Sequence, residues 1–362
     1  MHKPAFSLLL SVITFFLTID LSNAFSNHSP PPDSTITNIM EELKIPGLSY
    51  TVVKEGETLA KKSIGYRNLD VKSPEKPQTN HFIASATKTF TGIGVMKLVE
   101  AGKIELDESI RTYLPDVHPE WAKVTVRQAV SHTSGLPSIL DENGDPIGGG
   151  DISQAWEIVK EKPLERQPGQ LWKYSQIGLE VVQRIAKSVT GKSWESHIQD
   201  TIFDSAGMRN SYWLWDMPAQ TPNRSVVYDV SDNEASGIKK YDIRTNFDYY
   251  LPAGTGIFTN VNDMANYAKA LQSGKLLGNE LLQEMWTSSE FEESAFEWMQ
   301  GYGIGWILDK YGGQQRVWHS GGGKAIFMHY PDKNLSIIVL TNLANGGVTP
   351  FANKLSDHYL DQ

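Results

Sequence analysis

The sequence predicts an α/β fold of the α+β type, in which helices flank an antiparallel β-sheet and a mostly helical domain is inserted between its strands. Three patterns lead to this prediction: a β-hairpin near the N-terminus, helices and loops across the middle, and strands followed by a helix at the C-terminal end. The simplest assembly is one sheet built from both ends of the chain. We expect an α/β subdomain of residues 34–114 and 251–362, and a helical subdomain of residues 115–250.

The first expected elements are a helix, a hairpin and a second helix. Residues 34–45 begin with polar residues, have helical spacing and stop at Pro46-Gly47. Apolar and β-branched residues then run through 47–70, with a turn at Glu55-Gly56. Residues 86–101 are apolar nearly all round, so this helix belongs in the interior.

Helical spacing dominates the middle of the chain and strand patterns dominate its end. Helical segments are expected at 125–133, 151–162 and 177–203, separated by loops containing Gly and Pro. Residues 301–343 contain three or four strands joined by Gly or Pro-Asp turns. Residues 349–362 read as a closing helix.

Composition bounds the class of protein. The chain has 362 residues, of which 40% are hydrophobic, enough for one large domain or two smaller ones that share an interface. Its net charge of −9 and the lack of a basic run argue against nucleic-acid binding. The absence of cysteine excludes disulfides, cysteine-bound zinc and thiol catalysis. We expect no metal and no cofactor.

The N-terminus has the layout of a secretory signal peptide. His2 and Lys3 precede the apolar run AFSLLLSVITFFLT, and the small-residue sequence SNA ends at Ala24. This predicts a signal peptide of residues 1–24, cleaved after Ala24, and a secreted or periplasmic protein; the alternative is a retained anchor. Residues 25–33 read as a disordered leader. No later stretch is long and apolar enough to predict a membrane span.

A possible nucleophile stands at the start of the interior helix. In IASATKTFTG, residues 83–92, Ser85 precedes Lys88 by three positions, which places both on one helix face. The helix N-terminus favours developing negative charge, and a lysine among apolar residues has a lowered pKa and can act as a base. The alternative is a helix start followed by a surface lysine, because Ser-x-x-Lys recurs at 73–76 and 236–239.

Two further stretches could carry chemistry. In PGQLWKYSQIG, residues 168–178, Tyr174 follows a Pro-Gly turn; the alternative is a loop tyrosine that packs on a helix start. In VWHSGGGKAIF, residues 317–327, His319-Ser320 precedes three glycines. Glycines in a strand mark a close approach of another group, such as a substrate, or alternatively a bulge or turn.

Taken together, the three stretches resemble the serine β-lactamase and penicillin-binding-protein superfamily. The resemblance covers residues 34–362 and is strongest with the branch of class C β-lactamases, D-Ala-D-Ala carboxypeptidases, esterases and D-aminopeptidases. The family motifs Ser-x-x-Lys, Tyr-x-Asn and Lys-Thr-Gly (often His-x-Gly) match, in order, Ser85 to Lys88, Tyr174 to Gln176, and His319 to Gly321.

The resemblance implies a mechanism. Ser85 would attack a carbonyl carbon, while Lys88 and Tyr174 move its proton to the leaving group. The backbone N–H groups of Ser85 and Gly322 would bind the oxyanion, and water would hydrolyse the acyl-enzyme. Because no Ser-Asp-Asn motif is present, Tyr174 is expected in the proton transfer rather than a separate glutamate.

The implied substrate is a small molecule or peptide with an acyl group: a D-amino-acid peptide, a β-lactam or a carboxylic ester. The sequence does not choose among these, and the oligomeric state is open. A protein of another class is the alternative, namely a β-lactam-binding or cell-wall-associated protein that acylates without efficient turnover.

The sequence departs from the family pattern at Gln176, and at His319 it differs from those relatives that have lysine. Gln176 stands where an asparagine usually contacts the substrate amide, and it offers the same chemistry on a longer arm. His319 stands where many relatives have lysine; with an ordinary pKa near 6.5 it would be mostly neutral at pH 7. We therefore expect weaker attraction of a substrate carboxylate, and a preference for neutral substrates that sharpens between pH 6 and pH 8.

Other residues near the motifs are expected to be structural. His132, in SHTSGLP, is interpreted in this way. Several aromatic residues could line an apolar acyl pocket, although core packing is the simpler expectation for each of them: Trp172, Trp213, Trp215, Tyr249 and Tyr250.

Overall fold

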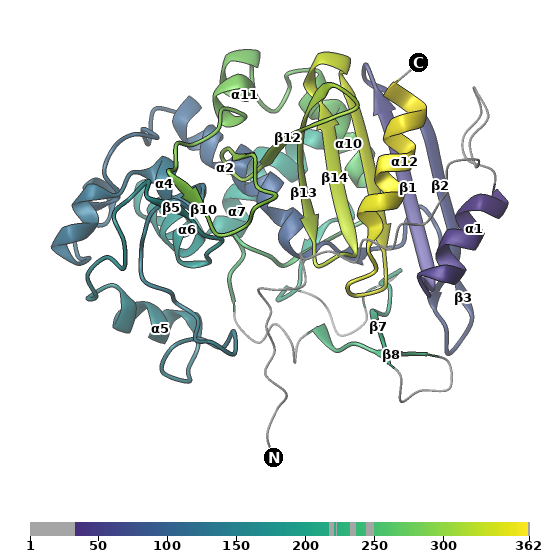
Figure 1. Ribbon diagram of the computed structural model, residues 1–362, viewed down its shortest axis with the longest axis horizontal. Helices are drawn as coiled ribbons and strands as arrows, with labels where there is room; N and C mark the ends of the chain where they lie inside the picture. Colours follow the sequence, from purple (N-terminus) through teal and green to yellow (C-terminus); the bar gives the residue numbers. More distant parts are fainter. Residues whose placement is uncertain (1–32, 217–220, 222, 232–236, 244–249, 361–362) are drawn as a thin grey trace.

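The structure is a computed structural model, and it describes residues 33–216, 221, 223–231, 237–243 and 250–360 (Figure 1). The predicted signal peptide, residues 25–32 of the predicted leader, and Tyr249 lie outside the described residues. Residue 33, expected to end the leader, instead begins the first helix, α1 (Asp33–Glu42).

One antiparallel sheet of eight strands forms the centre of the fold, and the two ends of the chain build it together (Figure 1). The N-terminal strands are β1 (Gly47–Lys54), β2 (Glu57–Asn68) and β3 (Ser73–Pro74). The C-terminal strands are β11 (Gly301–Tyr302), β12 (Ile307–Tyr311), β13 (Gln314–Gly321), β14 (Ala325–Tyr330) and β15 (Leu335–Thr341). Because β1 pairs with β15, the predicted sheet from both chain ends is confirmed.

Helices cover both faces of this sheet. On one face lie α1 and α12 (Val348–Leu360); on the other lie α2 (Lys88–Glu100) and α10 (Val261–Gln272). Strand β15 shows the consequence: Ile337 and Val339 join the core under α1 and α12, whereas Ile338 and Leu340 join the core on the other side. The near-continuous apolar sequence of β15 follows from this two-sided burial.

The β1–β2 hairpin turns where the sequence predicts. Glu55 has φ of 50° and Gly56 has φ of 79°, so both central residues are left-handed. A two-residue turn of this kind matches the natural twist of paired strands.

Helices and short strands form the rest of the described fold. Helices are present in all three predicted middle segments: α4 (Val126–Val130), α5 (Ile152–Val159), and, in the third, α6 (Ile177–Thr190) and α7 (Trp194–Ile198). The third segment is therefore two helices and not one, because left-handed Gly191 ends α6. Four helices lie outside the predicted elements: α3 (Ile110–Tyr113), α8 (Asp204–Ala206), α10 and α11 (Asn279–Met285). The short strands are β4 (His81–Phe82), β5 (Leu171–Trp172), β6 (Tyr212–Trp213), β7 (Tyr228–Val230), β8 (Ile238–Lys240), β9 (Ile257–Thr259) and β10 (Glu293–Ser294).

Local capping signals explain where two of these helices begin. Thr125 and Gln128 form a reciprocal capping box before α4, and Asp151 and Gln154 form another before α5. Such pairs satisfy the free N–H groups of the first helical turn.

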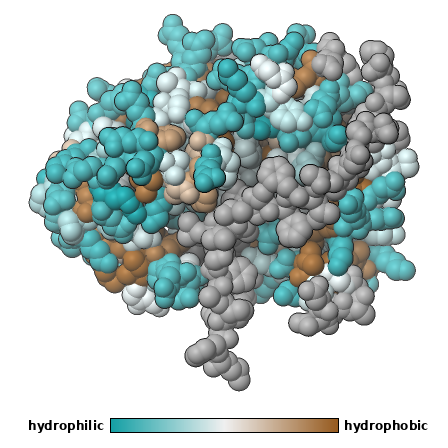
Figure 2. All heavy atoms as spheres, in the orientation of Figure 1, coloured by the Kyte–Doolittle hydropathy of each residue, from teal (hydrophilic) through white to brown (hydrophobic). Residues whose placement is uncertain are grey.

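Polar side chains dominate the face shown in Figure 2, and apolar residues appear there as separate patches. Within the residues that the structure describes, no helix has the length and apolar character needed to cross a membrane. The expected subdomain boundaries near residues 114 and 250 stay a prediction.

Candidate active site

Ser85 lies in a single 3₁₀ turn, Ala84–Thr87, that leads directly into α2. The expected helix start at residue 86 is therefore a tighter turn, and the α-helix itself begins at Lys88. Ala84 has φ of 45°, a left-handed conformation that is uncommon for a residue with a side chain. In residues 81–96 every position is buried except Ser85, which is partly exposed. The turn thus presents one hydroxyl to solvent from an interior segment.

Three predicted residues meet at this turn. The Tyr174 hydroxyl donates a hydrogen bond of 2.9 Å to Ser85 Oγ, and Lys88 Nζ lies 3.3 Å from the same oxygen. Tyr174 belongs to the loop between β5 and α6, so a loop far away in sequence brings its hydroxyl to the nucleophile turn. Two proton-carrying groups therefore contact one hydroxyl.

Lys88 is fully buried, so it is not a surface lysine. Its Nζ donates a 2.8 Å hydrogen bond to the carbonyl oxygen of Gly254 and lies 4.8 Å from the centre of the Tyr174 ring. Burial lowers the pKa of Lys88 to about 7, because desolvation disfavours the charged form. At neutral pH a large share of the side chain is a neutral amine that can accept a proton.

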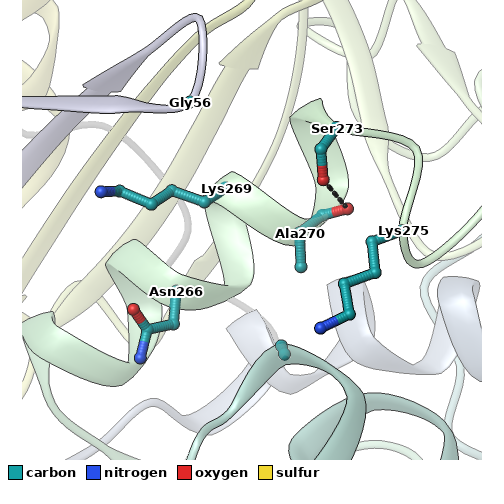
Figure 3. Close-up of a pocket in the computed structure, with 7 residues that line it drawn as sticks. Gly56, Asn266, Lys269, Ala270, Ser273 and Lys275 are labelled. Carbon is teal, nitrogen blue, oxygen red and sulfur yellow. Dashed lines mark hydrogen bonds between the residues drawn. The ribbon is translucent and has the colours of Figure 1, made fainter.

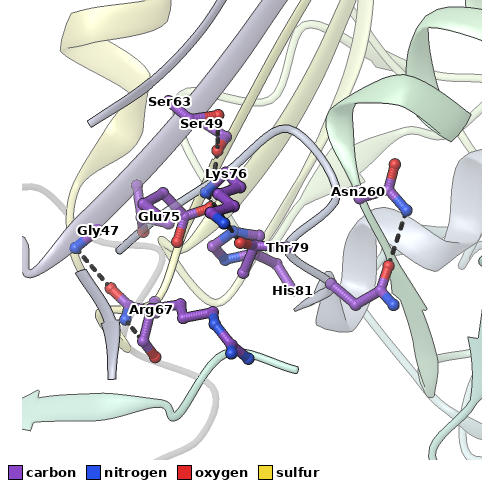
Figure 4. Close-up of polar contacts among 12 residues, drawn as sticks. Gly47, Ser49, Ser63, Arg67, Glu75, Lys76, Thr79, His81 and Asn260 are labelled. Atoms are coloured by element: carbon purple, nitrogen blue, oxygen red, sulfur yellow. Dashed lines mark hydrogen bonds and ion pairs between the residues drawn. The ribbon is translucent and has the colours of Figure 1, made fainter. Parts of the chain in front are cut away.

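A buried polar cluster holds the segment that leads into the nucleophile turn (Figure 4). Ser49 on β1 donates a 2.8 Å hydrogen bond to Glu75, and His81 Nε2 lies 2.9 Å from the same carboxylate oxygen. Asn80, the residue before His81, accepts a 2.8 Å hydrogen bond from the side chain of Asn260. These contacts tie β4, three residues before Ser85, to the central sheet and to the start of α10.

The end of β13 packs directly on the nucleophile turn. A Cβ atom built on Gly321 would lie 1.8 Å from the carbonyl oxygen of Ile83, so no side chain fits at this position. Gly322 follows with φ of 51°. Gly321 therefore lies against the segment that carries Ser85, and Gly322 is the next residue along the chain.

His319 is buried on β13, with its ring 6.4 Å from the ring of Tyr174. Its Nδ1 lies 2.7 Å from the carbonyl oxygen of Ser320, whereas its Nε2 has no hydrogen-bond partner among the described residues. Burial, aided by the charge of Lys88, lowers the pKa of His319 to about 3. The expectation that His319 changes charge between pH 6 and pH 8 is therefore wrong, because the ring stays neutral throughout that range.

Gln176 lies where the Tyr174 loop enters α6. Its Oε1 is buried and has no hydrogen-bond partner among the described residues. This oxygen lies against Gly254: a Cβ atom built on that glycine would be 2.8 Å from it. The amide thus lies beside the residue whose carbonyl holds Lys88. This places Gln176 near the other candidate residues, although none of its hydrogen bonds in the described part of the chain reaches them.

His132 supports the loop that carries Tyr174. Its Nδ1 accepts a 3.3 Å hydrogen bond from the Ser175 N–H, and its ring centre lies 4.6 Å from that of Tyr174. Burial lowers the pKa of His132 well below its ordinary value, so it packs as a neutral ring. These contacts agree with the structural interpretation.

The aromatic residues near the motifs divide into two groups. Trp172 and Trp213 are buried in the core. The ring centre of Trp215 lies 4.6 Å from that of Tyr250 in an edge-on contact, and Tyr250 is 42% exposed, so core packing does not describe Tyr250.

Two residues that contact the site were not predicted from the sequence. Gly254 supplies the carbonyl that holds Lys88, and Lys324 reaches back over Gly322 from the β13–β14 turn. The sequence pattern that could have indicated Lys324 is a single lysine in the otherwise apolar and glycine-rich stretch of residues 321–327.

A separate surface hollow of about 280 Å³ lies beside α10 and the β1–β2 turn (Figure 3). None of the candidate site residues lines it; its lining residues are Gly56, Ala206, Asn266, Lys269, Ala270, Ser273 and Lys275. Within the described parts of the chain, no group of three His, Asp or Glu side chains could hold a metal ion.

We compared the sequence and the fold with those of known proteins to identify the family. The family model named Beta-lactamase matches residues 32–359. The chain therefore belongs to the Beta-lactamase family, and its fold is β-lactamase/transpeptidase-like.

Individual relatives agree with this assignment. Protein flp of Staphylococcus aureus is 24% identical over 337 residues, which cover 90% of this chain and 64% of that protein. The chain thus spans less than two thirds of that relative's length. An octameric penicillin-binding protein homologue from Pyrococcus abyssi superposes with a TM-score of 0.77 at 26% identity, covering 90% of this chain and 76% of the other.

A D-amino acid amidase from Ochrobactrum anthropi, solved with L-phenylalanine amide, has the same fold. It superposes with a TM-score of 0.72 at 21% identity, covering 90% of this chain and 97% of the other. At this identity the likeness establishes the fold alone.

Proposed function

We propose that this protein is a serine hydrolase that cleaves an ester or amide through an acyl-enzyme on Ser85. The observation that carries the proposal is the contact of one partly exposed hydroxyl with two proton-carrying groups, Tyr174 at 2.9 Å and Lys88 at 3.3 Å. A hydroxyl is a weak nucleophile until a neighbouring base takes its proton. The pKa of Lys88, lowered to about 7, suits it to be that base near neutral pH.

The proposed proton path begins on Ser85 and ends on the leaving group. As Ser85 Oγ bonds to the carbonyl carbon, its proton passes to the neutral Lys88 amine. The Gly254 carbonyl oxygen fixes this amine by accepting a hydrogen bond from one of its N–H groups, which leaves the lone pair free to face Ser85. Tyr174, in contact with both groups, gives its hydroxyl proton to the departing oxygen or nitrogen when that bond breaks, and takes back a proton from the Lys88 ammonium.

The developing oxyanion would be bound by backbone N–H groups of Ser85 and Gly322. The tight contact between Gly321 and Ile83 supports this, because it fixes the second segment against the first. Donors fixed in advance stabilise the transition state without reorganising during the reaction. Water then attacks the acyl carbon, the bond from that carbon to Ser85 Oγ breaks, and a proton from the water returns through Lys88 and Tyr174 to Ser85 Oγ.

Covalent labelling tests this proposal. A fluorophosphonate probe should add once to the wild-type protein at Ser85, with loss of fluoride, as read by intact and peptide mass spectrometry. Ser85→Ala should abolish both labelling and hydrolysis of a 4-nitrophenyl ester, with an unchanged thermal unfolding curve.

Ser73→Ala is the matched control, because Ser73 heads a second Ser-x-x-Lys sequence but lies on the short edge strand β3. It should label and hydrolyse like the wild-type protein. Labelling that persists in Ser85→Ala would reject the proposed nucleophile.

The same ester separates a turning-over enzyme from a protein that only acylates. We expect a steady release of nitrophenol well beyond one equivalent, with or without an initial burst. Release that stops at one equivalent per Ser85 would favour a β-lactam-binding or cell-wall-associated protein instead.

We also propose that the chain is exported, with cleavage after Ala24. The basic and apolar pattern of residues 1–24 supports this proposal. N-terminal sequencing of the protein recovered from the culture medium or periplasm should begin at residue 25; a mature chain that begins at Met1 would contradict cleavage.

A further inference from the structure

Lys324 is a second buried lysine beside the candidate active site. It is only 2% exposed and belongs to the tight turn between β13 and β14, two residues after Gly322. Its side chain bends back over that glycine: a Cβ atom built on Gly322 would lie 3.0 Å from Lys324 Nζ. The ammonium therefore lies next to the segment that is proposed to bind the oxyanion.

Hydrogen bonds hold the backbone of Lys324, and this fixes the point from which its side chain extends. Its N–H donates to the Gly321 carbonyl at 3.0 Å, and its own carbonyl accepts from the Thr341 N–H at 2.7 Å. Gly322 and Gly323 have φ of 51° and 66°, left-handed values that fold the turn back on itself. A rigidly held turn is a good support for a binding group.

The surroundings of the ammonium are aromatic rather than acidic. Nζ lies 5.6 Å from the ring centres of both Phe82 and Tyr241, and Phe82 is three residues before Ser85. Among the described residues, neither an ion pair nor a hydrogen bond involves this ammonium; the carboxylate of Asp229 acts on it only at longer range. Aromatic faces stabilise a cation, but they replace only part of the water that burial removes.

A buried cation without a close carboxylate partner has unused capacity to bind an anion. The described lysines that form ion pairs are at least partly exposed, for example Lys97 with Glu100 and Lys192 with Asp200. His319, at the position where many relatives carry a lysine, is neutral and cannot supply a positive charge. Arg316, three residues before the third motif, pairs with Asp309; Lys324, three residues after the motif, is the nearest described cation that is not in an ion pair.

We infer that Lys324 is a specificity-determining residue that binds a carboxylate of the substrate, close to the scissile bond. The inference rests on the proposed serine hydrolase function and gives it a substrate class, namely esters or amides that carry a carboxylate within reach of the oxyanion site. It reverses the preference for neutral substrates that His319 alone predicts. Burial lowers the pKa of Lys324 to about 8, which leaves most of it charged at pH 7.

Matched ester pairs test the inference. On the leaving-group side the pair is 3-carboxyphenyl acetate and 3-carbamoylphenyl acetate; on the acyl side it is the 4-nitrophenyl monoesters of glutaric acid and glutaramic acid. Each pair differs by one charge at nearly constant size. In the wild-type protein we expect a higher kcat/KM for the carboxylate member of at least one pair.

Lys324→Met should lower that preference about tenfold, the usual scale of a charged hydrogen bond. Lys310→Met is the matched control, because it removes one positive charge from an exposed position on β12; it should leave every rate unchanged. Equal losses on both members of each pair, or no change in the preference, would overturn the inference and assign Lys324 a structural or oxyanion role.

A wild-type measurement covers the case in which Lys324→Met does not fold. 3-Carboxyphenylboronic acid should inhibit hydrolysis of a neutral ester several-fold more strongly than 3-carbamoylphenylboronic acid does. Equal inhibition, together with equal rates in both ester pairs, would overturn the inference while leaving the serine hydrolase proposal intact. Absence of turnover with all four esters would overturn the proposed function itself.

Discussion

The two buried lysines beside the nucleophile turn differ in their partners. Lys88 on α2 donates to a backbone carbonyl, contacts Ser85 Oγ and packs over Tyr174. Lys324, in the β13–β14 turn, has two aromatic rings around it and a distant carboxylate. Burial alone would lower both pKa values; Asp229 partly opposes the effect at Lys324, and no carboxylate does so at Lys88.

This comparison shows that burial does not by itself define a role for lysine. A lysine held by a carbonyl beside a hydroxyl suits proton transfer, because its neutral form is accessible near pH 7. A lysine held among aromatic faces and charged at pH 7 suits the binding of an anion. The partners, rather than the depth, separate a proposed base from a proposed binding group.

Removal of the Lys88 amine should have the largest effect. Lys88→Ala should lower turnover of a neutral ester by about 10²- to 10⁴-fold, the usual range for positioned proton transfer. Lys88→Arg should restore little, because a guanidinium does not give up its proton. Steady-state kinetics with a 4-nitrophenyl ester measures both effects.

Lys97→Ala is the control for that experiment, because Lys97 lies on the same helix but pairs with Glu100 at its outer end. It should retain full activity. If Lys88→Arg hydrolyses the ester at a near-normal rate, the proposed base role fails.

The next largest effect is expected at the contact between Gly321, at the end of β13, and Ile83, which precedes the nucleophile turn. Gly321→Ala would place a methyl group 1.8 Å from the Ile83 carbonyl oxygen, so β13 or the nucleophile turn must shift. We expect a loss of about 1–3 kcal/mol in the free energy of unfolding, together with reduced activity. Urea unfolding and ester kinetics provide the two measurements.

Gly278→Ala is the matched control, because a Cβ atom at Gly278 would meet nothing within 4 Å and its φ is −67°. It should change stability by less than about 1 kcal/mol. Equal losses of stability in both variants would contradict the close contact between Gly321 and Ile83.

The pH dependence of kcat/KM gives the smallest effect. It distinguishes Lys88, with a pKa of about 7, from Lys324, with a pKa of about 8. If neutral Lys88 is the base, kcat/KM for a neutral ester should rise about tenfold from pH 6 to pH 8 and then level, because the side chain loses its proton near pH 7. Its titratable neighbours His132 and His319 stay neutral throughout this range, since burial lowers the pKa of each. Rates that stay flat or fall over this interval would assign the proton transfer to another group.

Local patterns in the sequence were sufficient for much of the fold. The run of apolar and β-branched residues and the Glu55-Gly56 turn predict the first hairpin, and strand patterns at both chain ends predict one shared antiparallel sheet. The three-residue spacing of Ser85 and Lys88 fixes their common face, because helix geometry is local. The apolar sequence around Lys88 also predicts its burial, which the structure shows.

Contacts between distant segments were decided only by the tertiary structure. The hydroxyl of Tyr174 and the carbonyl of Gly254 reach the nucleophile turn from 89 residues beyond Ser85 and 166 residues beyond Lys88. The charge of His319 depends on desolvation by segments that no local pattern positions, so an ordinary pKa was the wrong assumption. Lys324 illustrates the same limit: its sequence position is next to the third motif, but only the folded turn brings its ammonium over Gly322. Periodicity determines which face of an element is buried, whereas the groups that meet there depend on how the elements pack.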